Sequence, residues 1–134
     1  MTQWLAGMKI TAARLNDFTP VAVTGTVTAA TNFSVTSFVA YDAGGQTWFA
    51  VQLTYSGSTI TASSSGDITD TQCCTLPSAL IPPAATWLPY KAGNTADGIV
   101  QIDTGGVCKL QTLSPTATIT ASSSINFSGV IATG

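Results

Sequence analysis

Apolar and polar residues alternate along most of this chain with a period of two. The clearest run is 48–55, where Phe49, Val51, Leu53 and Tyr55 alternate with smaller or more polar residues. Such alternation predicts a β-strand with one face in a core and the other toward solvent. Weaker runs of the same kind predict further strands at 21–28, 33–41, 58–62, 68–76, 87–91, 98–103, 107–113 and 125–131.

Glycine pairs and prolines separate these runs and mark the turns between them. Asp42-Ala43-Gly44-Gly45 predicts the turn of one hairpin, and Gly105-Gly106 predicts the turn of another. The stretch 77–83 predicts a loop, because its prolines have no N–H to donate to a ladder. Many short strands separated by turns indicate an all-β fold, and we expect an antiparallel β-sandwich of jelly-roll type.

The first 19 residues do not follow the strand pattern. Thr11 can cap a helix and the residues after it are good helix formers, so we expect a short N-terminal helical segment, too short to be stable alone. We therefore divide the chain into an attachment segment, 1–19, and a β-sandwich knob, 20–134. The alternatives are a frayed terminus or a part of the knob's core. The apolar residues expected to attach the segment to a partner are Trp4, Leu5, Met8, Ile10 and Leu15.

Charged residues are scarce, at 7% of the chain, compared with about 25% in an average soluble domain. Exposed sheet edges are normally guarded by charges or prolines. A sheet protein with only four cations is short of such guards, so we expect its edges to be covered by neighbours in an assembly, with a homotrimer as the expected form. Four scattered cations also exclude the basic surface that a nucleic-acid partner needs.

The sequence gives no indication of a membrane partner or of export. No run reaches the 18 or more apolar residues of a membrane-spanning helix. The first residues also lack the basic stretch and apolar stretch of a signal peptide. We expect a protein that is made in the cytoplasm.

Three cysteines, Cys73, Cys74 and Cys108, make a poor disulfide framework, because the number is odd and two are adjacent. Neighbouring positions of a strand point to opposite faces, so we expect at most one of Cys73 and Cys74 to face the core. We expect free, buried thiols that pack as small hydrophobic side chains. Zinc is not expected, since the chain has no histidine and no separated cysteine pairs.

The ionisable residues do not suggest an enzyme. The chain has no histidine, so the usual general base is missing. Asp67 with Asp70, or Asp97 with Asp103, could supply the two carboxylates of a glycosidase, but aspartate near glycine is typical of turns. Calcium-loop spacing is absent as well. We expect no catalytic residues, no metal and no cofactor.

Aromatic residues offer one further kind of chemistry. Trp48, Trp87 and Tyr90 would contact a host-surface glycan if their rings were exposed together. Aromatic residues in strands are more often core residues or cross-strand partners. A carbohydrate-binding, host-recognition knob is therefore an alternative function.

One string of seven residues occurs twice. Thr-Ile-Thr-Ala-Ser-Ser-Ser stands at 59–65 and again at 118–124, and each copy follows a hairpin whose turn reads Asp-x-Gly-Gly. Duplication of a three-strand unit would explain both matches. Convergence in a chain rich in threonine and serine would explain them equally well.

Three segments together resemble a known group of proteins. Residues 4–16, Trp-Leu-Ala-Gly-Met-Lys-Ile-Thr-Ala-Ala-Arg-Leu-Asn, resemble the opening of short virion structural proteins of phages that infect actinobacteria. Residues 75–83 and 98–106 resemble a proline-rich loop and the following hairpin in the β knobs of those proteins. The resemblance implies a minor tail, tail-fibre or head-fibre protein located in the virion. Its N-terminal segment would dock on other virion proteins of the tail or capsid, and its trimeric knob would project. A capsid decoration protein that stabilises the shell is the alternative.

Overall fold

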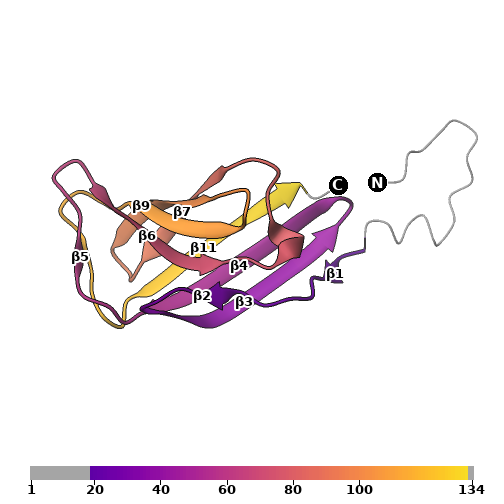
Figure 1. Cartoon of the computed structure of the whole chain (residues 1–134), viewed down its shortest axis with the longest axis horizontal. Helices are drawn as coiled ribbons and strands as arrows, with labels where there is room; N and C mark the ends of the chain where they lie inside the picture. Colours follow the sequence, from indigo (N-terminus) through magenta and orange to yellow (C-terminus); the bar gives the residue numbers. More distant parts are fainter. Residues whose placement is uncertain (1–18, 133–134) are drawn as a thin grey trace, which may run out of the picture.

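The computed structural model describes residues 19–132, which form a curled, nine-stranded antiparallel sheet and a separate two-stranded sheet (Figure 1). The expected all-β class is confirmed. The expected N-terminal helical segment lies outside the described residues. The elements are β1 (Val21–Ala22), β2 (Thr28–Ala29), β3 (Phe33–Ala43), β4 (Gln46–Tyr55), β5 (Ile60–Thr61), β6 (Asp67–Thr75), the 3₁₀ turn η2 (Ser78–Leu80), β7 (Thr86–Ala92), β8 (Ala96–Ile102), β9 (Val107–Thr112), β10 (Thr118–Ile119) and β11 (Ser124–Ala132).

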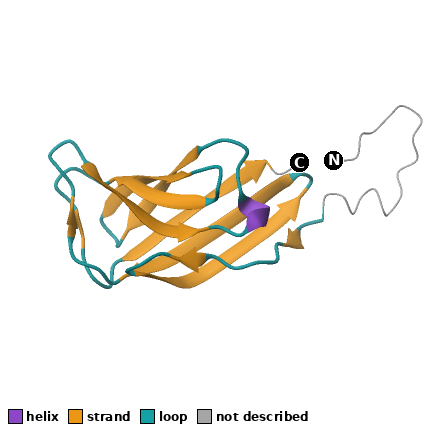
Figure 2. Ribbon diagram, in the orientation of Figure 1, coloured by secondary structure: helices purple, strands orange, loops and turns teal. Residues whose placement is uncertain are grey.

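The large sheet curls so that its two halves face each other across one core (Figure 2). Its strand order is β1-β3-β4-β11-β7-β8-β9-β6-β2, with β3, β4 and β11 in one half and β7, β8, β9 and β6 in the other. The alternation at 48–55 predicts the inward face correctly, since Phe49, Val51, Leu53 and Tyr55 are all buried. The arrangement is sandwich-like, with the apolar faces of both halves turned inward.

The two halves meet at a short seam between β11 and β7. β11 pairs with β4 from Ser124 to Ala132, but it pairs with β7 at only three positions, from Ile125 to Phe127. Because the Gly93 N–H donates to the Ser124 carbonyl oxygen, alternate residues of β7 before Gly93 also turn their backbone groups toward β11. Pro89 is one of them and has no N–H to donate. The last pair of the ladder is therefore Tyr90 with Phe127, and the pairing stops next to Pro89.

The stretch 21–28, expected to be one strand, is instead divided between the two edges of the sheet. β1 pairs with edge strand β3, and β2 pairs with β6 at the opposite edge. Between them Gly25 has a φ of 126°, and a Cβ there would lie 2.7 Å from the Cβ of Pro77. Glycine thus lets residues 21–29 cross the open side of the sandwich as a strap.

The sheet edges are better guarded than the low charge led us to expect. The strap of residues 21–29 covers part of both edges, and edge strand β3 carries a register shift between Val35 and Ser37. A covering segment and a bulge are two of the devices that prevent edge-to-edge pairing of sheets. Part of each edge of the large sheet is therefore protected within residues 19–132.

The two copies of the repeated string pair with each other. Ile60 of β5 is opposite Ile119 of β10, and Thr61 is opposite Thr118. β5 leads from hairpin β3–β4 to β6, which pairs with β9 of the other hairpin. β10 leads from hairpin β8–β9 to β11, which pairs with β4. Each three-strand unit thus supplies the third strand of the other.

The two hairpin turns have similar sequences but different geometry. Gly44 and Gly45 have φ values of 61° and 83°, which is the left-handed pair that a two-residue hairpin turn needs. In the other turn, the Asp103 Oδ1 atom accepts the backbone N–H groups of Val107 at 3.0 Å and Gly105 at 2.9 Å. These two hydrogen bonds lower the pKa of the Asp103 carboxyl group.

A glycine on β8 makes room for a core aromatic ring. The Tyr90 hydroxyl donates to the Thr112 carbonyl oxygen at 2.7 Å, and the ring lies against Gly98, its partner on β8. A Cβ at position 98 would clash with that carbonyl oxygen and would lie 2.5 Å from the Tyr90 ring. The ring and residue 98 can therefore share this space only if residue 98 has no side chain.

We predict that Gly98→Ala lowers the free energy of unfolding by about 1–3 kcal/mol, the usual effect of overpacking a filled core. Gly105→Ala is the control, because a Cβ at 105 would meet only the Asp103 carboxylate at 3.3 Å. Its effect should stay within about 0.5 kcal/mol. Urea denaturation of both variants measures the difference, and equal losses would show that Gly98 is not sterically required.

Candidate functional site

An open groove of about 490 Å³ lies on the outer face of the sheet at the seam between β11 and β7. Five polar side chains that line it form one cross-strand row, because their residues are partners in register on five neighbouring strands. The row runs through Ser37, Gln52, Asn126, Lys91 and Asp97. It presents a hydroxyl, two amides, an ammonium group and a carboxylate in sequence across the sheet.

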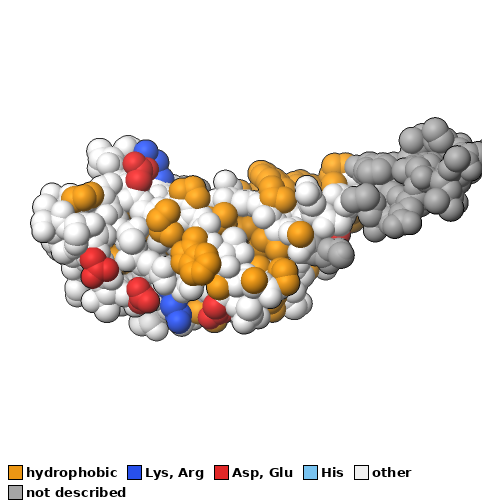
Figure 3. Space-filling view, turned by 90° about the horizontal axis from the view of Figure 1, so that it is seen from above, with side chains coloured by type: hydrophobic (Ala, Val, Ile, Leu, Met, Phe, Trp, Pro, Cys, Tyr) orange, Lys and Arg blue, Asp and Glu red, His pale blue; other side chains and the backbone are white. Residues whose placement is uncertain are grey.

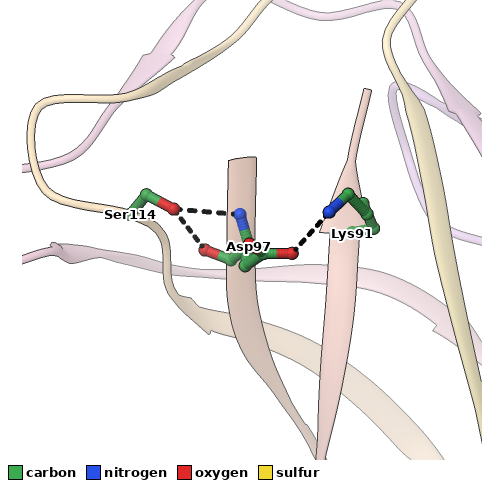
Figure 4. Close-up of polar contacts among 3 residues, drawn as sticks. All are labelled: Lys91, Asp97 and Ser114. Atoms are coloured by element: carbon green, nitrogen blue, oxygen red, sulfur yellow. Dashed lines mark hydrogen bonds and ion pairs between the residues drawn. The ribbon is translucent and has the colours of Figure 1, made fainter. Parts of the chain in front are cut away.

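The charged end of the row is held by three elements (Figure 4). Lys91 Nζ on β7 lies 3.1 Å from Asp97 Oδ1 on β8. Ser114, in the loop after β9, accepts the Asp97 N–H at 3.0 Å and donates to the Asp97 carbonyl oxygen at 3.2 Å. Both charged side chains are largely exposed, so the pair contributes little to stability. Its effect is to cancel the charge at this end of the groove.

The two amides in the middle of the row retain most of their hydrogen-bonding capacity. Within residues 19–132, the Asn126 side chain makes one long hydrogen bond, from Nδ2 to the Ser124 Oγ at 3.4 Å. The Gln52 side chain makes none within the same range. An amide group has two donors and an acceptor with two lone pairs. The groove therefore offers donors and acceptors that the described residues leave open to solvent or a ligand.

A second surface is apolar and lies at the end of the sheet where β1 begins. Tyr41, Trp48 and Val130 are cross-strand partners on β3, β4 and β11, with exposed fractions of 44%, 44% and 54%. The two rings stack with their centroids 6.1 Å apart. Together with Pro20, Ala43 and Gln46, these side chains enclose a hollow of about 330 Å³. We call Tyr41, Trp48 and Val130 the apolar row.

The space-filling view shows how few charges the surface carries (Figure 3). Hydrophobic side chains gather over the half of this face toward the end where β11 finishes, on the right. The charged side chains stand in the other half and along its margins. On this face, the two ends of the sandwich therefore differ in surface chemistry.

The three residues expected to contact a glycan do not form one aromatic surface. Trp48 stacks on Tyr41, while Trp87 is 55% exposed and donates its indole N–H to Gln111 at 3.2 Å. Tyr90 is only 2% exposed, and its ring packs in the core against Gly98. The expectation that the Tyr90 ring is exposed is wrong, because the alternation along β7 places this ring inside the sandwich.

The five residues expected to attach the chain to a partner all precede the described part of the chain. These residues, which lie outside 19–132, are Trp4, Leu5, Met8, Ile10 and Leu15.

All three cysteines are fully buried, so the expectation that only one of Cys73 and Cys74 faces the core is wrong. The register shift on β6 explains it: Gln72 is opposite Lys109 and Cys74 is opposite Cys108, which leaves Cys73 as an extra residue. A bulge of this kind turns two consecutive side chains to one side.

The three cysteines are free and buried on the neighbouring strands β6 and β9. Cys73 Sγ donates to the Cys108 carbonyl oxygen at 3.4 Å. Hydrogen bonding to the Cys74 sulfur, together with burial, raises the pKa of the Cys73 and Cys108 thiols. Hydrogen bonds from the Cys108 and Cys73 thiols lower the pKa of the Cys74 thiol to about 5. All three cysteines are nevertheless inaccessible, and buried structural cysteines are inert toward reagents.

Two of the aspartate side chains, and the backbone of a third, take part in local contacts. Asp97 pairs with Lys91, Asp103 caps its turn, and the Asp67 N–H donates to the Ser63 Oγ at 3.0 Å. In the described part of the chain, no three or more cysteine or acidic side chains gather in a way that could hold a metal ion. Nor does any helix between residues 19 and 132 have the length and apolar character needed to cross a membrane.

Comparison with models of known protein families and with curated proteins finds no match for this chain. The case for function therefore depends on the two surfaces just described.

The groove was not anticipated from the sequence, although one signal for it is present. Pro89 lies inside a run that otherwise reads as a strand, and proline in a strand interior marks a place where the ladder ends. The polar row depends on register across five strands, and pattern analysis of single strands does not give register.

We predict that iodoacetamide leaves all three thiols of the native protein unmodified at neutral pH, because burial keeps the reagent from Cys73, Cys108 and also from Cys74, whose pKa is lowered. The same reagent should modify all three after unfolding without reductant. Intact-mass analysis counts the adducts, and glutathione in the same tube confirms that the reagent is active. Modification in the native state, or fewer than three adducts after unfolding, would contradict buried free thiols.

Proposed function

We propose that this chain is a non-enzymatic structural protein of a larger assembly, of the phage virion type, and that it is anchored through the end of the sandwich that carries the apolar row. The observation that carries the proposal is the apolar row itself, which leaves large hydrophobic side chains exposed on a chain with few charges. Contiguous exposed apolar surface is typical of an interaction site.

The position of the apolar row supports this role. Pro20, next to the first described residue, lines the same hollow as Tyr41 and Trp48. The segment 1–19, expected to attach the chain, therefore joins the knob beside the apolar row. Surface and segment can engage one partner at the same end, which leaves the other end of the sandwich free to project.

The energetics are adequate for docking. Full burial of a large apolar side chain contributes roughly 1.5–3 kcal/mol. The side chains of Tyr41, Trp48 and Val130 are each about half exposed, so covering them would contribute part of that amount for each. A partner that also covers the neighbouring Val39, which is exposed, gains further. A few such residues commonly dominate an interface.

The finer architecture of the knob is also a proposal. We propose that the chain forms a homotrimer and that the apolar row, rather than the sheet edges, makes the contact between its subunits. The jelly-roll type is supported by strand number and spacing, whereas β7, β8 and β9 are joined as successive hairpin neighbours, in the manner of a meander. Location in the virion is supported by the resemblance of segments 4–16, 75–83 and 98–106 to actinobacteriophage structural proteins.

We predict that the purified full chain is a trimer by multi-angle light scattering and that Trp48→Ser shifts it to monomer, because the exposed indole would be central to the contact. Trp87→Ser is the matched control, since Trp87 is also exposed but lies outside the apolar row. It should leave the trimer intact. A wild-type chain that stays monomeric at micromolar concentration would overturn the trimer, and equal effects of both variants would overturn the apolar row as its interface.

We further predict that a chain lacking residues 1–17 folds cooperatively but is not incorporated into particles. The reason is that the described fold begins after this segment, whose apolar residues would then bind the assembly. Thermal melting followed by circular dichroism tests folding, and mass spectrometry of purified particles tests incorporation. Normal incorporation would place the attachment elsewhere, and loss of folding would make the segment part of the core.

A further inference from the structure

The groove at the seam exists because a ladder is interrupted at a defined place. Lys91 and Pro89 turn their backbone groups toward β11, and Pro89 with Ser128 would be the next pair but one after Lys91 with Asn126 if the ladder continued. Without an N–H at position 89 the strands part, and Ser128 and Pro89 both line the opening. An apolar or β-branched residue would fit the strand pattern better. Proline is thus disfavoured in a strand and yet lies where the groove forms, and such departures from local preference are common at functional sites.

The residues that line the groove do not suit an anion, a metal ion or an apolar ligand. An anion would need a cation that is not already engaged, but Lys91 is paired with Asp97 at 3.1 Å. A metal ion would need several carboxylates, and Asp97 is the only acid among the described residues that line the groove. An apolar ligand would cover the Gln52 and Asn126 amides without giving them hydrogen-bond partners, which is unfavourable.

From the polar row and the groove that it lines, we propose that this site binds a neutral saccharide. Hydroxyl groups on adjacent sugar carbons both donate and accept hydrogen bonds, as do the Gln52 and Asn126 amides and the Ser37 and Ser128 hydroxyls. The C–H face of a pyranose would lie against Pro89, and Ala50 also lines the groove. The volume of about 490 Å³ falls within the range of small-molecule sites.

This site differs from the aromatic contacts expected from the sequence. The Trp48 ring stacks on Tyr41, and the Trp87 indole N–H donates to Gln111. Neither tryptophan lines the groove. Recognition depends on hydrogen bonds rather than on ring stacking. It does not depend on the assembly proposed above, since the groove lies within one chain.

The test is an NMR titration of the ¹⁵N-labelled full chain with glucose, galactose, N-acetylglucosamine and maltose. At least one sugar should shift the backbone amides of Gln52, Lys91 and Asn126 in a saturable way. Glycerol serves as the control for an adventitious polyol, and inorganic phosphate as the control for an anion. No saturable shift with any sugar, or equal shifts with glycerol, overturns the proposal, as does a response confined to Trp48 and Tyr41.

Two variants test the mechanism of binding. Gln52→Ala removes one amide from the row and should weaken the affinity roughly two- to tenfold, as expected for one lost hydrogen bond. Gln72→Ala is the matched control, because Gln72 is exposed on β6 and does not line the groove. Unchanged affinity in Gln52→Ala, or equal losses in both variants, counts against the site.

Pro89→Val tests the cause of the groove with a readout that needs no ligand. The new N–H at 89 should bond to the Ser128 carbonyl oxygen, so its hydrogen exchange should be slow and the groove should close. Sugar-induced shifts should then disappear while the protein remains folded by circular dichroism. Fast exchange at residue 89, or sugar binding that persists in the folded variant, would overturn the role of Pro89.

Discussion

The structure depends on the short ladder between β11 and β7. It is the only strand pairing that joins the two halves of the large sheet within residues 19–132, and it consists of three residue pairs. On its other side β11 is paired with β4 along its full length, from Ser124 to Ala132. One strand is thus held firmly in one half and loosely in the other. The sheet can therefore bend at the seam, which places both apolar faces against one core.

The same bend distributes chemistry over the outer surface. Where β11 and β7 stay paired, the outward side chains form a polar row that ends in a neutralised ion pair. Where they part, Pro89 and Ser128 line an opening, and one more step along β4 and β11 leads to Trp48 and Val130. A chain with so few charges cannot distinguish its surfaces by net charge. It distinguishes them by amides and hydroxyls in one region and by exposed rings in another.

Sequence patterns predict local features of this fold well. The strands, the inward face of 48–55 and both hairpin turns follow from alternation and from glycine placement. The errors share one cause, which is contact between distant residues. Gly25 splits an expected strand because Pro77 lies against it, and Cys73 faces the core because β6 is bulged against β9. The groove was missed for the same reason, since Gln52, Asn126 and Lys91 become neighbours only through register.

The exchange of third strands between the two hairpin units has a consequence for how the chain must fold. Gln46 of the first hairpin pairs with Ala132 near the end of the sequence, so the most extensive inter-unit ladder joins residues far apart along the chain. Folds of such high contact order are slow, because the entropy of closing a long loop is lost before the pairing is gained. Neither unit can complete its sheet alone, and the apolar strand β4 stays unpaired on one side until β11 has been synthesised. The period of greatest risk for aggregation therefore lasts until β11 has been synthesised, and this nine-residue strand is the segment whose loss would leave that exposed edge permanent.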